Sequence, residues 1–339
     1  MNEKRLGRRT IALHHPPSVH SCAAVGGRME GNGPLAPYFD VLGQDSFFGE
    51  KTWEKAESAM QKQALQTALD KGGLKPKDLD YVLGGDLLNQ CIGSAFGLRD
   101  FEIPYYGLYG ACSTMGESLS LAALLIDGGY ADKAAAITSS HFCTAERQYR
   151  MPVPYGSQRT PTAQWTATAS GCTILSAKGK GPYITHITCG KMVDWGITDA
   201  NNMGAAMAPA AYATIKAHME DMGLTPKDYD MIVTGDLGQL GKELLLELAQ
   251  RDGIELGGKL SDCGTMVFDN TVQDVHSGGS GCGCSAITLC GHLLGELSKG
   301  KLKKILFCGT GALLSPTSTQ QGLPIPGVCH AVAIEGGKS

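Results

Sequence analysis

The sequence has no excess of either charge and no long hydrophobic run. Its 339 residues include 29 Lys and Arg against 33 Asp and Glu, a formal net charge of −4. Because no basic excess exists to neutralise phosphates, we expect no nucleic-acid partner. The best apolar stretch, residues 119–126, is too short to cross a bilayer. Any membrane association is therefore expected to be peripheral or through a partner.

Two further features are missing: an apolar segment after the basic residues 1–10, and a compact disulfide framework. The first absence argues against a secretory signal. The twelve cysteines are scattered along the chain, and a chain of this length buries a large core without disulfides. We therefore expect most of them to be reduced and packed as small apolar residues. With 42% hydrophobic residues, the chain is not expected to be intrinsically disordered.

Glycine is abundant, with 46 residues, and the chain repeats itself. At a constant offset of 150, residues 74–90 and residues 224–240 are identical at eight of 17 positions. Each copy follows a helical pattern that ends at Gly73 or Gly223. Each then contains a Pro-Lys-Asp turn, a short apolar strand and a Gly-Asp loop.

The two halves match again after a shift. Residues 123–130 precede an expected strand at 134–139, and residues 292–299 precede an expected strand at 304–308. Alternating strands and helices predict a mostly parallel sheet with both faces covered. Two related copies predict an α/β fold of stacked layers with pseudo-two-fold symmetry. In such folds sites form beyond the carboxyl ends of strands, so the loops there are the candidates.

Cys112 lies in the first of these loops, where the chain enters an apolar helix. Backbone N–H groups and the dipole at a helix start stabilise a thiolate, so the pKa of this thiol is predicted to fall and its nucleophilicity to rise. The alternative is a small buried cysteine without chemistry.

The corresponding glycine-rich loop in the second half contains His276. By the repeat it falls opposite Cys112, where it could act as the base for the thiol; a structural histidine is the alternative. Glycines at 279, 281 and 283 resemble a nucleotide-binding loop, but the six-residue fingerprint and the later acidic residue are missing. Cys282 and Cys284, one residue apart, do not have the usual zinc spacing. We therefore expect no cofactor and no metal.

The last loop follows the expected strand that ends at Cys308, which we expect to reach the same face as Cys112. Its counterpart in the first half ends at His141, a second candidate for the pocket rim.

A duplicated α/β chain with Cys112 at a helix start, His276 in a His-x-x-Gly loop and Cys308 at a strand end resembles the thiolase superfamily. The resemblance implies a thiolase-like fold, with one half over residues 1–175 and the other over 176–339, and it makes these three residues candidate catalytic groups. One departure is at Leu237, where thiolases and ketoacyl synthases carry an Asn or His that helps hold the thioester oxygen. The oxyanion arrangement is therefore expected to be incomplete.

In detail the sequence resembles the stage V sporulation protein AD family. The segments 52–58, 109–114, 138–141, 155–166 and 276–283 carry this resemblance. It implies a non-enzymatic chain that binds dipicolinic acid and acts with SpoVA membrane proteins in loading the spore. It also implies a cytoplasmic-type soluble chain associated peripherally with the spore inner membrane. The candidate ligand-binding residues are Cys112, Ser113, His141, Arg150, Asp236, His276, Gly279, Ser280 and Gly281.

Three hypotheses stay open from the sequence. The first is a dipicolinate-binding subunit, in which the Pro-, Tyr- and Arg-rich residues 147–159 form a lid; these residues could equally be a dimer interface or a surface loop. The second is a thioester-dependent acyltransferase with Cys112 as nucleophile. The third is a structural adaptor with a vestigial cleft. We also expect a homodimer, because thiolase-like sheets usually continue across a two-fold axis and an open sheet edge is an aggregation hazard.

Overall fold

The computed structural model describes residues 4–149 and 159–337. Ten strands form one continuous hydrogen-bonded path, and five short strands lie beside it or pair separately. The path strands of the first half are β3 (Ser18–Gly26), β5 (Tyr81–Gly85), β6 (Tyr105–Gly107), β7 (Lys133–Ser140) and β9 (Ala169–Ser176). Those of the second half are β10 (Tyr183–Thr188), β11 (Met231–Thr234), β12 (Leu260–Asp262), β14 (Lys304–Ala312) and β15 (Gly327–Glu335). The short strands are β1 (Arg5–Leu6), β2 (Thr10–Ala12), β4 (Val41–Leu42), β8 (Trp165–Thr166) and β13 (Gly279–Ser280).

Strand order is the same on both sides of the molecule. The first five strands run β6-β5-β7-β9-β3, and the second five run β12-β11-β14-β15-β10. In each set the last strand of the half, β9 or β15, is antiparallel to both neighbours, while the β5 and β11 pairs are parallel. The two sets meet through one residue pair, Ser18 opposite Tyr183. The predicted repeat is therefore visible as two matching sheets.

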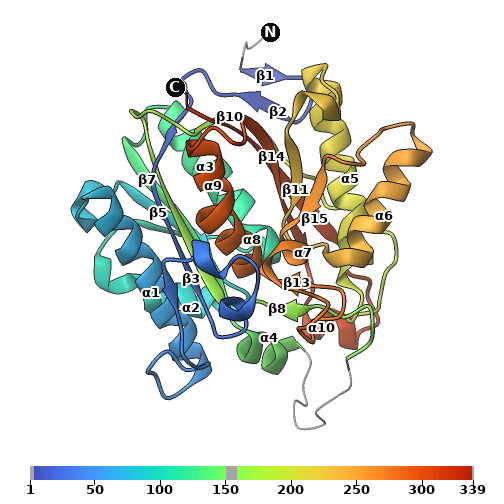
Figure 1. Cartoon of the computed structure of the whole chain (residues 1–339), viewed down its shortest axis with the longest axis horizontal. Coiled ribbons are helices and arrows are strands. Elements are labelled where there is room, and N and C mark those ends of the chain that lie inside the picture. Colours follow the sequence, from blue (N-terminus) through green and yellow to red (C-terminus); the bar gives the residue numbers. More distant parts are fainter. Residues whose placement is uncertain (1–3, 150–158, 338–339) are drawn as a thin grey trace.

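Helices fill three layers around these sheets (Figure 1). α1 packs on the outer face of the first sheet, against β3, β7 and β9, and α5 packs on the outer face of the second, against β14 and β15. α3 and α8 lie between the sheets, where α3 contacts β5 and β7 on one side and β14 and β15 on the other. The helices are α1 (Trp53–Gly72), α2 (Ile92–Leu98), α3 (Thr114–Asp127), α4 (Phe142–Tyr149), α5 (Met203–Met222), α6 (Gly238–Arg251), α7 (Cys263–Val267), α8 (Cys282–Thr288), α9 (Leu294–Ser298) and α10 (Pro316–Gln320). The short helical turns are η1 (Glu30–Asn32), η2 (Ala36–Tyr38), η3 (Pro76–Asp78), η4 (Asn89–Cys91), η5 (Arg99–Phe101), η6 (Ala111–Ser113), η8 (Pro226–Asp228) and η9 (Leu289–Leu293).

The repeated aspartates explain why the Pro-Lys-Asp segment recurs. Asp80 accepts the backbone N–H groups of residues 132 and 133 at 2.7 and 3.0 Å, at the start of β7. Asp230 accepts those of residues 303 and 304 at 2.6 and 3.0 Å, at the start of β14. Each carboxylate thus ties a turn to the entry of the neighbouring parallel strand. The preceding helices end as predicted, at Gly73 and Gly223 with φ of +63° and +64°.

The cysteines are packed as expected. All twelve lie within the described residues, all are free, and nine are buried. Several belong to hydrophobic clusters: Cys172 lies under α1, Cys263, Cys284 and Cys290 lie between the sheets, and Cys308 and Cys329 lie under α5. Within the described ranges, no helix is both long and apolar enough to traverse a membrane.

Candidate functional site

Cys112 lies where the chain leaves β6 and turns through η6 into α3. The residue before it, Ala111, has a φ of +49°, a strained conformation for a residue with a side chain. The thiol is buried and lines a small cavity of about 30 Å³, which is room for about two water molecules. The walls of the cavity are Leu87, Ala111, Ala145, Tyr149, Thr166, Met203, Ser280, Ala312 and Leu314.

The group closest in chemistry to Cys112 is the buried carboxylate of Asp236, whose charge acts on the thiol. Asp236 also accepts the N–H of Gly281 at 2.8 Å, the hydroxyl of Ser280 at 3.3 Å and the hydroxyl of Thr310 at 2.8 Å. Residues from the two halves of the chain therefore converge on one carboxylate, as the repeat predicted for this region.

The predicted activation of Cys112 is wrong. Burial, with the Asp236 charge and the nearby Cys282 thiol, raises the pKa of the Cys112 thiol well above its ordinary value. The expected helix-start effect is weak because the N–H of Ser113 is bonded to the carbonyl of Gly110 at 3.0 Å. Burial also raises the pKa of Asp236. The site holds a neutral thiol.

A larger cleft adjoins this cavity. It encloses about 470 Å³ and shares Leu87, Ala111, Tyr149 and Leu314 with the smaller space. Gln90 and Ala111 in its walls both have positive φ, and such strain is concentrated at functional sites in proteins. Its remaining lining residues are Asp86, Leu88, Asn89, Tyr109 and Leu313.

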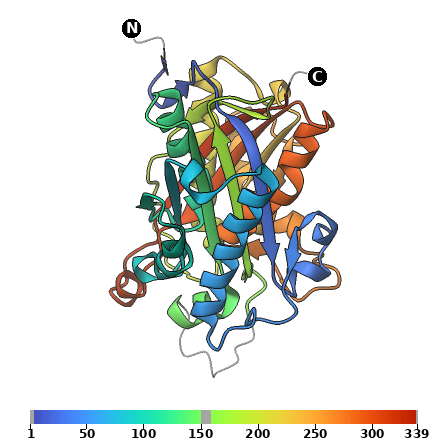
Figure 2. The same ribbon diagram turned by 90° about the vertical axis from the view of Figure 1, so that its left-hand side faces the viewer.

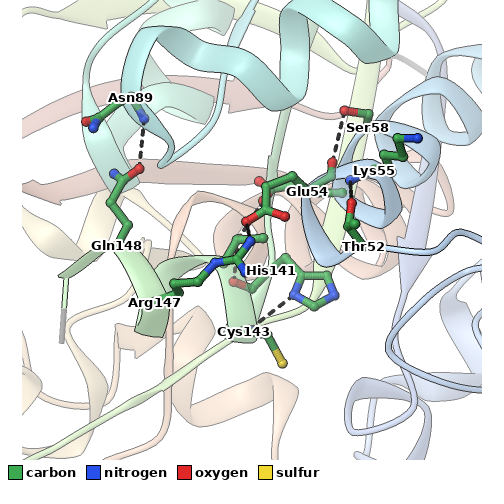
Figure 3. Close-up of polar contacts among 11 residues, drawn as sticks. Thr52, Glu54, Lys55, Ser58, Asn89, His141, Cys143, Arg147 and Gln148 are labelled. Carbon is green, nitrogen blue, oxygen red and sulfur yellow. Dashed lines mark hydrogen bonds and ion pairs between the residues drawn. The ribbon is translucent and has the colours of Figure 1, made fainter. Parts of the chain in front are cut away.

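α4 closes the junction between the two spaces. Gln148 donates its amide to the carbonyl of Leu87 at 2.8 Å, Tyr149 donates its hydroxyl to the same carbonyl, and the N–H of Asn89 donates to Gln148 at 3.0 Å. On its other side, Arg147 pairs with Glu54 of α1 (Figure 3). The helix is therefore held against both α1 and the cleft wall.

His276 does not lie opposite Cys112. Its side chain is 29% exposed, its Nε2 lies 3.3 Å from a carboxylate oxygen of the exposed Asp274, and it does not line the Cys112 cavity. Its φ of +50° places it in a sharp turn. The predicted thiol–imidazole pair is therefore not formed, because the turn directs the imidazole to the surface.

Cys308 and His141 are also placed away from the cavity, which corrects the prediction for both. Cys308 packs beneath α5 against Cys329, because it faces the outer side of β14 while Phe307 faces the central layer. His141 is buried, with its ring bonded to the carbonyl of Ser46 at 2.8 Å. The ring also accepts the N–H of Cys143 at 3.1 Å, as Figure 3 shows. Burial lowers the pKa of His141, as befits a structural imidazole.

The remaining predicted residues have backbone or packing roles. Ser113 donates its hydroxyl to Gly110 at 2.7 Å, and the carbonyl of Gly279 accepts the Gln164 amide at 2.7 Å. Gly281, with a φ of +96°, donates to Asp236 at the start of α8. Arg150 lies outside the described residues.

Leu237 is buried under α5 and α6. Its N–H donates to Asp262 at 2.8 Å, so neither its side chain nor its backbone N–H offers a hydrogen bond to a ligand. The oxyanion donor is missing at this position, as the sequence indicated.

Comparison with known proteins decides the family. The model of the family described as stage V sporulation protein AD (SpoVAD) matches residues 7–335. The stage V sporulation protein AD of Bacillus subtilis (strain 168) is 43% identical over 332 residues, which cover 98% of each chain. The chain belongs to the SpoVAD family.

Solved structures place this SpoVAD family member in the thiolase-like fold. The 3-oxoacyl-[acyl-carrier-protein] synthase III of Aquifex aeolicus VF5 is 13% identical, with 94% of this chain and 99% of that chain covered and a TM-score of 0.58. OleA of Xanthomonas campestris with bound cerulenin is 14% identical, with 94% and 96% covered and a TM-score of 0.59. The predicted fold is confirmed, and at this identity the likeness concerns the fold alone.

Sequence reasoning missed a buried acidic pair in this SpoVAD family member. Glu57 of α1 and Asp86 at the cleft are both buried, and burial together with the Asp86 charge raises the pKa of Glu57 to about 8. Glu57 accepts hydroxyls of Ser139 at 3.2 Å and Thr144 at 2.8 Å. One signal was available: Glu57 is spaced three and seven residues before Met60 and Ala64, on the apolar face of the helix.

In residues 4–149 and 159–337, no group of three or more His, Cys, Asp or Glu side chains is arranged to hold a metal ion. Cys282 instead donates its thiol to the carbonyl of Ser139 at 2.9 Å.

Proposed function

We propose that this chain binds dipicolinic acid during sporulation, in the cleft lined by Asp86, Gln90, Tyr109 and Leu314, without forming a covalent intermediate. The observation that carries the proposal is the contrast between two adjoining spaces. The cavity at Cys112 holds about 30 Å³, whereas the cleft holds about 470 Å³, within the range of roughly 300–1,000 Å³ typical of small-molecule sites.

The chemistry at Cys112 supports a binding role over an acyltransferase. The thiol is buried and neutral, it lies beside a carboxylate rather than an imidazole, and residue 237 supplies no oxyanion donor. Nucleophilic catalysis by cysteine needs a thiolate or an adjacent base. These residues are better suited to pack beneath a bound ligand than to react with it.

The cleft offers a flat aromatic ligand apolar walls and neutral donors. Leu87, Leu313 and Leu314 supply apolar surface, and Tyr109 and Gln90 supply a hydroxyl and an amide. Among the described residues that line this cleft there is no Lys or Arg, so a dicarboxylate there meets the negative charge of the Asp86–Glu57 pair. Binding therefore favours the protonated form of that pair, and we expect affinity to fall as the pH rises past about 8.

The test is titration calorimetry with dipicolinate. In Leu314→Trp the larger side chain fills the cleft, and we expect affinity to fall by about ten-fold or more, since contact area is replaced by protein. Leu323→Trp introduces the same residue at a site that is 49% exposed and outside the cleft lining, and it should bind as the unmodified chain does. Absence of heat with dipicolinate, or equal affinity in Leu314→Trp, refutes the proposal.

A separate measurement addresses the enzymatic alternative. The chain and Cys112→Ser are incubated with acyl-coenzyme A and analysed by mass spectrometry. We expect no acyl adduct on Cys112; an adduct that disappears in Cys112→Ser establishes the acyltransferase instead.

The proposal includes a homodimer that acts with membrane proteins of the SpoVA group. β6 supports the dimer, because it is the unpaired edge of the first sheet and exposes Tyr105 and Tyr106 at 37% and 54%. A second copy that pairs through β6 would extend the sheet and cover these rings. Sedimentation of the chain against Tyr106→Glu should show a dimer becoming a monomer; a monomeric unmodified chain contradicts this part.

A further inference from the structure

The end of the molecule opposite the candidate cleft exposes two matching loops. Residues 178–180 and residues 299–301 both read Lys-Gly-Lys. The first loop joins β9 to β10, and the second joins α9 to β14. β1 and β2 lie at this end of the molecule, at the top of Figure 1, and α4 lies at the bottom; Figure 2 shows the same ribbon from the side.

The end of β15 brings the two loops to one surface. Gly337 lies so close to the first loop that a Cβ there would be 2.1 Å from the carbonyl oxygen of Lys180. Gly336 donates its N–H to the carbonyl of Lys303, beyond the second loop, at 2.8 Å. The backbone therefore places the lysines of both loops on either side of the carboxyl end of β15. We name Lys178, Lys180, Lys299, Lys301, Lys303 and Lys304 the lysine face.

Carboxylates balance only part of this charge. Glu296 pairs with Lys299 at 3.7 Å and with Lys301 at 3.0 Å, and Glu335 pairs with Lys304 at 3.2 Å. Asp230 bonds the backbone entering β14. Three carboxylates therefore contact these six lysines or the backbone beside them. Asp132, whose carbonyl accepts the N–H of Ala177, adds a fourth negative charge beside the first loop. The six lysines still outnumber these carboxylates, in a chain whose formal net charge is −4.

Exposure and residue type indicate the kind of partner. The side chains of Lys299 and Lys301 are 59% and 64% exposed, and Lys178, Lys180 and Lys303 are exposed as well. All six are Lys, a hydrated point charge that suits a diffuse negative surface, whereas Arg is the residue for bidentate recognition of a fixed carboxylate or phosphate.

An aromatic side chain lies at the same end. Tyr130, in the turn after α3, is 73% exposed. The end of α3 is tied to the amino-terminal strands, since Asp127 accepts from Lys4 and from the N–H of His15, both at 2.6 Å. Exposed Tyr is favoured where a protein meets the headgroup region of a bilayer.

We propose that the lysine face binds the surface of an anionic lipid bilayer by electrostatic attraction, with Tyr130 at the headgroups and the candidate cleft directed away from the lipid. This rests on the part of the proposed function in which the chain acts with SpoVA membrane proteins, and it is independent of dipicolinate binding. Loop lysines attract anionic headgroups within a Debye length of the surface.

The test is co-sedimentation of the full chain with vesicles of phosphatidylcholine alone or mixed with phosphatidylglycerol. We expect binding only to the mixed vesicles, and weaker binding as salt is added. Replacing Lys180, Lys301 and Lys303 by Gln should lower the partition coefficient by about 100-fold, since three charges are removed.

A matched control carries Lys51→Gln, Lys55→Gln and Lys242→Gln, near the starts of α1 and α6, and should bind as the unmodified chain does. Equal binding to neutral vesicles, no binding to the mixed vesicles, or an unchanged partition coefficient in the lysine-face variant overturns the proposal. Binding to polyglutamate but not to vesicles also overturns it, in favour of an acidic protein. Calorimetry with dipicolinate on the same variant separates this outcome from a failure of the cleft.

Discussion

The two Gly-Asp loops of the repeat follow equivalent strands, yet their carboxylates accept hydrogen bonds from different parts of the fold. Asp86 accepts the N–H of Leu88 at 2.8 Å and both the N–H and the hydroxyl of Ser94, at 2.7 and 2.6 Å, so it caps the start of α2. Asp236 instead faces the central layer, where it bonds Thr310, Ser280 and Gly281 and acts on the thiol of Cys112 by its charge.

The difference comes from a third carboxylate. At the start of α6 the N–H groups of Leu237 and Gly238 donate to Asp262, at 2.8 and 3.0 Å. Because Asp262 accepts the free N–H groups at this helix end, Asp236 is not needed there and can face the central layer. The same dipeptide thus caps a helix in one half and joins the two halves in the other. The shared Gly-Asp sequence determines the conformation of the loop, but it does not determine which groups the aspartate side chain contacts.

Removal of Asp236 should have the largest effect. Asp236→Ala leaves the Thr310 hydroxyl and the Gly281 N–H buried without their acceptor, and we expect a loss of about 3–5 kcal/mol in the free energy of unfolding. Asp86→Ala should cost less, because the repulsion between Asp86 and Glu57 disappears at the same time. Denaturant unfolding of both variants checks the order, and equal losses contradict the comparison.

The acidic pair in the first half should make stability depend on pH. The folded-state pKa of Glu57, about 8, lies above its ordinary 4.5, so its contribution is full below about 4.5 and is lost as the pH rises towards 8. Glu57→Gln should flatten this decline, by on the order of 2 kcal/mol at pH 8. Unfolding curves from pH 5 to about pH 9 provide the measurement; parallel profiles for the two proteins would rule out the assignment.

Single hydroxyl deletions compare the two loops more finely. Thr310→Val removes one donor to Asp236, and Ser94→Ala removes one donor to Asp86 while its N–H remains. We expect losses of about 2 and about 1 kcal/mol in the free energy of unfolding, because hydrogen bonds to charged or buried acceptors are worth roughly these amounts. A larger loss for Ser94→Ala than for Thr310→Val would reverse the inferred importance of the two carboxylates.

The smallest effect is on reactivity rather than stability. Cys112, which is buried beside the Asp236 charge, should be alkylated by iodoacetamide at least about ten-fold more slowly than the exposed Cys189. Peptide mass mapping over time gives both rates in one sample. In Asp236→Asn the charge beside Cys112 is gone, so its rate should rise; a fast Cys112 in the unmodified chain contradicts the neutral thiol.

The architecture could be predicted because it depends on backbone features that repeat. Gly73 and Gly223 end helices, and Asp80 and Asp230 tie equivalent turns to equivalent strands. These features depend on local helix capping and hydrogen bonding. Because the same features occur in both repeats, the assignment of an element in one repeat supports the assignment of its counterpart in the other.

The site could be predicted only in part. Cys112, Asp236, Ser280 and Gly281 converge as expected, since their backbone positions follow from the fold. The direction of a side chain does not follow in the same way: Cys308 and Phe307 are neighbours on β14, and a shift of one residue exchanges the faces they occupy. His276 depends in the same way on one turn with positive φ.

The single residue pair that joins the sheets, Ser18 with Tyr183, has a consequence for dissection of the chain. Cohesion between the halves comes mainly from α3 and α8, whose apolar faces are shared by both sheets. Cutting the polypeptide between β9 and β10 would separate the pair of Ser18 with Tyr183 and the three residue pairs between β2 and β10, and it would leave each fragment with an exposed apolar face. Such fragments should be insoluble when made separately and should reassemble when produced together, as a complementing pair.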